Sequence, residues 1–204
     1  HFSNNCRVKS EVFKRRFWDA CALIVFHPKN NTFLLQHRNV KMSNGGNMFG
    51  IISGRKELTE SDPLSTMFRE AKEEFFGHTL TKKRFLKNIH SCTKVNSTHV
   101  FIYIANDCEI NYEGNPECVW ELNCELYPKG HEWVTYAELR DMVFNRGSLN
   151  GIEMWPYRKY MFRSVWKDLN RLNFLSTHNR PLEGNYILQN NTSDLVCQNV
   201  KTKA

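Results

Sequence analysis

The sequence lacks the features that are typical of membrane proteins, secreted proteins and proteins stabilised by structural metal sites. It has no run of about 18 apolar residues, so we expect no membrane-spanning helix and no membrane partner. Its first 16 residues are polar and basic, without an apolar stretch, so we expect no signal peptide. The seven cysteines form no Cys-x-x-Cys pair, which argues against a zinc site or a disulfide framework. We therefore expect free thiols and an intracellular location, in the cytoplasm or nucleus.

Positive charge is what the chain has in excess. Lys and Arg number 28 against 21 Asp and Glu, which gives a net charge of +7 and a pI near 9.1. Such a balance favours an acidic partner, although charge alone does not identify one. At 204 residues and 41% hydrophobic content, the chain is long enough for one domain with a core. We expect a basic N-terminal segment (1–16), a domain (17–175) and a polar tail (176–204).

Hydrophobic periodicity predicts alternating strands and helices. We expect a hairpin from residues 20–26 and 32–38, followed by strands at 48–52, 85–90, 99–105 and 132–134. Helices are expected at 63–77, 135–143 and 156–174. Asp62 followed by Pro63 is a helix start signal, and Thr135 is a good cap. This mixture predicts an α+β fold, organised as an α/β/α sandwich.

The segment most informative about chemistry runs from Gly54 to Glu74. Glu70 lies three and four residues before Glu73 and Glu74, so a helix brings the three carboxylates to one face. This crowding is unfavourable unless a cation joins it, and hard divalent ions with oxygen ligands, Mg²⁺ or Mn²⁺, are the natural completion. Such an ion neutralises phosphate oxygens and activates water, and a carboxylate then accepts the proton.

The same segment resembles the Nudix box, G-x5-E-x7-R-E-U-x-E-E-x-G-U, in which U is a bulky aliphatic residue. The positions that match in type and order are Gly54, Glu60, Arg69, Glu70, Glu73 and Glu74. Three departures occur. Eight residues separate Glu60 from Arg69, Phe76 takes the glycine position with Gly77 one place later, and Ala71 replaces the bulky aliphatic residue.

The resemblance implies a Nudix fold, with a mixed β-sheet between helices, and assigns roles within the box. Glu70, Glu73 and Glu74 would be metal ligands, together with the backbone near Gly54. Arg69 would orient them and pair with Glu60. The proton acceptor would be Glu73 or Glu74, or a glutamate outside the box, for which the candidates are Glu132, Glu125 and Glu121.

The box leaves the substrate open between two diphosphates. One is capped mRNA, cut to release methylated GDP, and the other is ADP-ribose or a related nucleotide; a non-catalytic RNA-binding module is a third possibility. The length and basic character also resemble viral Nudix proteins of the poxvirus and baculovirus type, which implies a host-cell location. On these grounds capped RNA is favoured. Oligomeric state is left open.

Capped RNA requires a basic surface and aromatic faces for the methylated guanine. On the last expected helix, four cations spaced by four residues form a row, which is also typical of a solvated helix face. The RNA-binding candidates are Lys159, Arg163, Lys167 and Arg171, with Lys14, Arg15 and Arg16 and residues 82–84 as extensions. The candidates for stacking on the base, each more typical of a core position, are Phe17, Trp18, Trp120 and Tyr157.

Overall fold

A computed structural model describes residues 19–109, 130–180 and 182 of the chain. The expected N-terminal segment (1–16) and most of the tail lie outside the described residues. None of the helices in the described part of the chain has the length and apolar character needed to span a membrane.

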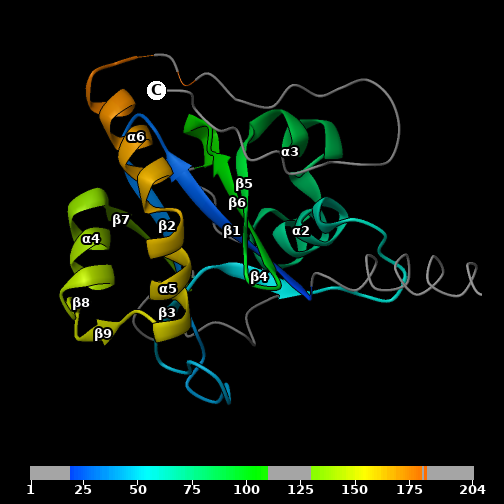
Figure 1. The fold of residues 1–204 in the computed structure, drawn as a ribbon, viewed down its shortest axis with the longest axis horizontal. Coiled ribbons are helices and arrows are strands. Elements are labelled where there is room, and N and C mark those ends of the chain that lie inside the picture. The colour runs from blue at the N-terminus through cyan, green and yellow to red at the C-terminus, as the bar shows by residue number, and fades with distance from the viewer. Residues whose placement is uncertain (1–18, 110–129, 181, 183–204) are drawn as a thin grey trace, which may run out of the picture.

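A mixed seven-stranded sheet forms the centre of the molecule (Figure 1). Its strands are β1 (Ala20–His27), β2 (Thr32–His37), β3 (Phe49–Gly50), β4 (Ile52–Arg55), β5 (Ile89–Val95), β6 (Thr98–Ile104) and β7 (His131–Thr135). The order is β3-β2-β1-β6-β5, with β4 added to β1 and β7 added to β2. β1 and β6 run parallel, and the other pairs are antiparallel.

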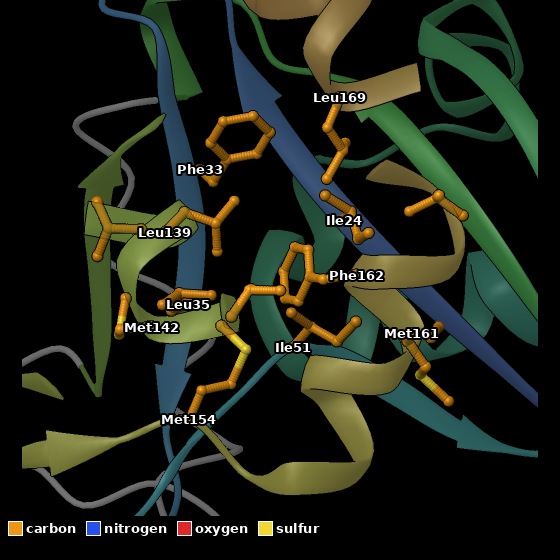
Figure 2. Close-up of a cluster of buried hydrophobic side chains, with 14 of the residues drawn as sticks. Ile24, Phe33, Leu35, Ile51, Leu139, Met142, Met154, Met161, Phe162 and Leu169 are labelled. Atoms are coloured by element: carbon orange, nitrogen blue, oxygen red, sulfur yellow. The ribbon is translucent and has the colours of Figure 1, made fainter. Parts of the chain in front are cut away.

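Helices cover both faces of this sheet, as Figure 1 shows. One face carries α4 (Tyr136–Phe144), α5 (Pro156–Ser164) and α6 (Trp166–Thr177); the other carries α2 (Pro63–Ala71) and α3 (Lys82–Asn88). Alternate residues of β1 enter two separate cores, Ile24 on the α4–α6 side and Leu23 on the α2–α3 side. Figure 2 shows the first core, where Phe162 of α5 packs among aliphatic side chains from the strands.

Smaller elements connect these layers. A π-helical turn, η1 (Lys72–Phe76), extends α2, and 3-10 turns follow at η2 (Gly77–Thr79) and η3 (Asp107–Glu109). A short hairpin, β8 (Ser148–Leu149) with β9 (Ile152–Glu153), leads into α5.

Strands β1 and β2 pair at one end and diverge at the other. They are partners at Phe26↔Phe33 and His27↔Thr32, whereas the first half of β1 pairs with β4 and the far end of β2 pairs with β3. Ile51, which separates β3 from β4, is buried where the strands part. The chain therefore places β4 and the end of β2 on the two sides of a fork in the sheet.

Two of the expected elements are wrong in detail. Residues 85–90 were expected as a strand, but α3 runs to Asn88 and β5 begins at Ile89. The Thr81 side chain accepts from Arg84 N at 3.2 Å and starts this helix. The last expected helix is interrupted at Val165, which leaves helical geometry (φ −109°, ψ 10°), so α5 and α6 are separate helices.

Candidate active site

The site begins where β4 leads into α2. The Asp62 side chain accepts from Ser65 N at 2.9 Å and Pro63 occupies the first helical position, so the local sequence fixes the start of α2. Gly54 in β4 lies directly against Glu70 of this helix. A Cβ atom on Gly54 would sit 1.8 Å from the Glu70 carboxylate. Glycine therefore allows the strand backbone and this carboxylate to meet.

Arg69 is the centre of the charge network. Its Nε lies 2.9 Å from Glu60 Oε1, and its Nη1 lies 2.6 Å from Glu70 Oε1 and 2.9 Å from Glu73 Oε2. Nη2 donates to the Arg55 carbonyl oxygen at 3.0 Å. Such charge-assisted bonds are short and directional. One guanidinium group therefore holds three of the box glutamates and the end of β4 together.

The titration of Glu60 and Arg69 reflects this pairing. Burial alone would raise the pKa of Glu60, but hydrogen bonds from Arg69 and Thr66 lower it below its ordinary value. Burial likewise opposes the charge on Arg69, and the Glu60 and Glu70 carboxylates outweigh it and raise the Arg69 pKa. Both groups are therefore charged across the physiological range.

Glu74 is held by groups from both sides of the fork. It is 7% exposed, and its Oε2 accepts from Ser53 N of β4 at 3.0 Å and from Gln36 Nε2 of β2 at 3.2 Å. Neither donor was predicted from the sequence. Gln36 carried a signal that could have been used, because it is a polar residue in the fully buried strand β2.

The π turn η1 accounts for the displaced glycine of the box. A π-helix bonds residue i to i+5, so it accommodates one residue more than an α-helical turn. Here it spans Lys72–Phe76, and the helix then ends at Gly77 with φ +55°, a conformation that favours glycine. The extra residue is thus taken up between Glu73 and the helix end, and Arg69 still reaches Glu73.

The chemistry of these residues fits Mg²⁺ or Mn²⁺. Carboxylates and a backbone carbonyl are the oxygen donors that hard cations prefer, and the cradle at Gly54 exists because no Cβ fills it. With Glu70 and Glu73 turned to Arg69, no three acidic, His or Cys side chains of the described residues are grouped to hold an ion. A bound cation would therefore compete with Arg69 for these two carboxylates.

The structure does not bring Glu132 to this cluster. In the β2–β7 ladder Glu132 is the partner of Leu35, whereas Gln36 is the partner of His131. Cross-strand partners share a face, and Leu35 belongs to the core under α4–α6, so Glu132 lies on the face opposite Glu74. Burial raises the pKa of Glu132. The other two candidate bases, Glu121 and Glu125, lie outside the described residues.

The expected row of cations is divided between two helices. Arg163 donates to the Val143 carbonyl oxygen from Nε at 3.1 Å and from Nη2 at 2.6 Å, and therefore closes the end of α4. Lys159 on α5 lies 3.8 Å from Glu153. Lys167 and Arg171 are exposed on α6. Two of the four cations are thus engaged within the protein.

Only some of the remaining candidate residues lie in the part of the chain that the structure describes. Tyr157 is 41% exposed, with its hydroxyl 3.2 Å from Thr98 Oγ1 and its ring 5.7 Å from that of Trp155. Residues 82–84 start α3, where Arg84 pairs with the buried Glu109 at 2.7 Å. The candidates that lie outside the described residues are Lys14, Arg15, Arg16, Phe17, Trp18 and Trp120.

Comparison with known proteins finds similarity in structure alone. No family model matches the sequence, and no curated protein does. A bifunctional NMN adenylyltransferase/ADP ribose pyrophosphatase from Francisella tularensis matches with a TM-score of 0.52 and 12% identity, over 80% of this chain and 45% of that one. This chain therefore spans less than half of that protein. DR0079 from Deinococcus radiodurans matches with a TM-score of 0.50 and 13% identity, over 72% of this chain and 82% of that one.

A Nudix hydrolase from M. smegmatis, RenU, is also similar, with a TM-score of 0.47 and 15% identity, over 82% of this chain and 89% of that one. At sequence identities this low, the similarity is evidence about the fold alone. The α+β fold predicted from the sequence, with a mixed sheet between helices, is confirmed. It is the fold that the resemblance to Nudix hydrolases implies.

Proposed function

We propose that this chain is a Nudix hydrolase that uses water to cleave a nucleoside diphosphate linkage, with Mg²⁺ or Mn²⁺ as cofactor. The observation that carries the proposal is the cluster around Arg69 of α2. Arg69 gathers Glu60, Glu70 and Glu73 beside Gly54. These are residues of the box, brought together although eight residues separate Glu60 from Arg69.

We assign metal binding and proton acceptance to different residues of the cluster. Glu70, Glu73 and Glu74 would hold the cation, with the backbone of Gly54 facing it. When bound, the cation neutralises phosphate oxygens and makes a water molecule a better nucleophile. Glu74 is fixed by Ser53 and Gln36, whereas the Glu73 side chain is 54% exposed. Glu73 therefore has the best access to water and is our candidate proton acceptor.

For the substrate, we place a small nucleoside diphosphate such as ADP-ribose first. The continuous helical row that favoured RNA is interrupted at Val165, and Arg163 binds the end of α4. The name of the Francisella protein includes an ADP ribose pyrophosphatase, which supports the same class. Capped RNA is the second candidate, because the chain carries a charge of +7 and Lys167 and Arg171 are exposed.

One assay tests both substrates. The full chain is incubated with ADP-ribose or with cap-labelled RNA, in Mg²⁺, in Mn²⁺ or in chelator, and the products are identified. AMP with ribose phosphate supports the first class, methylated GDP supports the second, and chelation abolishes either reaction.

Substitution assigns the reaction to the cluster. Glu73→Gln and Glu74→Gln should each lower turnover by about 100-fold or more in a folded protein, the scale expected for acid–base and metal catalysis. Glu153→Gln is the matched control, because Glu153 is an exposed carboxylate on β9 that makes no contact with Arg69 or the box glutamates. Unchanged turnover in both cluster variants contradicts the assignment. Hydrolysis of neither substrate by the unaltered chain supports the non-catalytic module instead.

A further inference from the structure

Two arginines pack against one tryptophan next to the proposed site. Arg38 follows β2, and its Cζ lies 5.2 Å from the centre of the Trp155 ring. Arg158 in α5 lies 4.9 Å from the same ring and 5.6 Å from that of Tyr157. The backbone of Trp155 is fixed to the sheet, because its main-chain N–H donates to the Phe49 carbonyl oxygen at 2.9 Å. The indole therefore holds both guanidinium groups in place.

These arginines have no carboxylate in direct contact among the described residues. Arg158 is 6% exposed, and it donates to the Ser53 hydroxyl and to Met161 Sδ at 3.2 Å, both neutral acceptors. The buried Nε atoms of Arg38 and Arg158 have no hydrogen-bond partner. Neither guanidinium forms an ion pair with a carboxylate in the described part of the chain. Burial, and then the charge of Arg38, lowers the pKa of Arg158 to about 10, and the charge of Glu74 opposes this shift without cancelling it.

An arrangement of this kind is unfavourable without an anion. Buried arginines are ordinarily paired, and two neighbouring like charges repel each other. The Met161 sulfur and the aromatic ring offset little of that cost. Planar guanidinium groups with unused N–H donors match the oxygens of phosphate. The cluster is therefore built for a ligand that brings negative charge.

The position of the cluster identifies that ligand. Arg158 contacts the Ser53 side chain, and Ser53 N donates to Glu74 at 3.0 Å. The next residue, Gly54, lies against Glu70. Successive residues of β4 point to opposite faces, so Arg158 meets the Ser53 side chain on the α4–α6 side, whereas Gly54 faces Glu70 on the α2–α3 side. The two groups approach each other at the fork between β4 and β2, where Ser53 N and Gln36 both donate to Glu74. A diphosphate lying in this fork can place one phosphate at the cation and the other at the guanidinium groups.

We propose that Arg38 and Arg158, held against Trp155, anchor a phosphate of the nucleoside diphosphate beside the metal-binding glutamates; this role rests on the proposed function. The indole serves as a platform for the arginines and not as a base-stacking face. Gly45 packs against it so closely that a Cβ there would lie 2.7 Å from Trp155 Cδ2. The recognised group is therefore the phosphate.

Direct binding of inorganic pyrophosphate, measured by calorimetry in chelator, tests the anchor without the metal or the reaction. The full chain should bind pyrophosphate, and Arg158→Met and Arg38→Met should each weaken binding by about 10- to 100-fold, the effect of losing charge-assisted hydrogen bonds. Arg180→Met is the matched control, because Arg180 also lies over an aromatic ring, 5.4 Å from that of Phe174, at an exposed position after the end of α6. Its affinity should equal that of the unaltered chain.

Thermal melting without ligand separates anchoring from a structural role. Methionine keeps the length of the side chain and removes an unpaired buried charge, so Arg158→Met should melt at the same temperature as the unaltered chain or higher. A lower melting temperature with unchanged pyrophosphate affinity would show that Arg158 is structural and overturn the proposal. Should Arg158→Met not fold, Arg38→Met, at a partly exposed position, decides the question by its affinity.

The outcomes also separate this proposal from the proposed function. Pyrophosphate binding that depends on both arginines, without metal-dependent hydrolysis of any substrate, supports the anchor and rejects the hydrolase. Metal-dependent hydrolysis with unchanged affinity and unchanged kcat/KM in both arginine variants supports the hydrolase and rejects the anchor. Absence of pyrophosphate binding by the unaltered chain also rejects the anchor.

Discussion

Replacing Gly54 by alanine should separate activity from stability. The new Cβ would lie 1.8 Å from Glu70 Cδ and Oε1, where ordinary contacts begin at 3.4 Å, so the carboxylate must retreat by about 1.6 Å. Metal–ligand distances tolerate only about 0.2 Å, and a misplacement of about 1 Å can cost 100-fold in rate. We expect kcat/KM to fall by at least about 100-fold.

The stability of Gly54→Ala should fall far less than its activity. The displaced atoms belong to the end of a side chain, and Gly54 has no positive φ that would strain alanine. The Arg69–Glu70 contact of 2.6 Å would be lost, at a cost of about 1.5–3 kcal/mol because the Glu70 side chain is only 10% exposed. Alanine returns about 0.4–1 kcal/mol by restricting the unfolded chain. The melting temperature should therefore fall by only about 2–8 °C.

Gly151→Ala serves as the control, because it should lower stability without lowering activity. Gly151 has φ +77° with nothing within 4 Å of its missing Cβ, so alanine there is strained without touching a neighbour. It should lose about 1–2 kcal/mol of stability and keep its activity. Metal-dependent hydrolysis and thermal melting, measured on both variants, decide the matter. Activity within a few-fold of the unaltered chain in Gly54→Ala would refute the role given to Glu70, and failure to fold would refute the packing argument.

Two further variants test the charge network and the basic surface. Glu60→Gln should lower stability at pH 7 by about 1.5–3 kcal/mol, the value of a charged hydrogen bond. Because the folded-state pKa of Glu60 lies below its ordinary 4.5, this contribution exists above that value and disappears as pH falls through the folded pKa. Urea unfolding at several pH values should show the gap closing in acid, and a constant gap would contradict the pairing. The double variant Lys167→Ala, Arg171→Ala should lower kcat/KM on capped RNA, flatten its salt dependence and spare ADP-ribose. Equal loss on both substrates would remove the RNA role from α6.

Local signals in the sequence predicted much of the fold. The hairpin β1–β2, the start of α2 at Asp62 and the capped helix α4 each depend on a few neighbouring residues. The error at residues 85–90 arose where a short apolar segment fits either element, and the Thr81 cap decides for helix. The parallel pairing of β1 with β6 joins segments about 80 residues apart, and no local pattern encodes it.

The candidate site was likewise predicted only in part from local signals in the sequence. Arg69, Glu70, Glu73 and Glu74 were visible because they lie at regular spacing along α2 and the turn η1 that extends it. Gln36, Ser53 and Arg158 were not, because they come from three distant segments that meet through the fork of the sheet. The four cations were expected to form one row because their spacing by four assumes an unbroken helix. Val165 interrupts that helix, so the cations lie on two separate helices.

The π turn has a consequence for how counted motifs are applied. A motif written with a fixed number of residues treats every insertion as a mismatch, and this helix carries one extra residue between Glu74 and Gly77. The insertion lies beyond the contacts of Arg69, which still touches Glu70 and Glu73. A motif of fixed length can therefore miss a chain whose charged side chains still form the expected contacts.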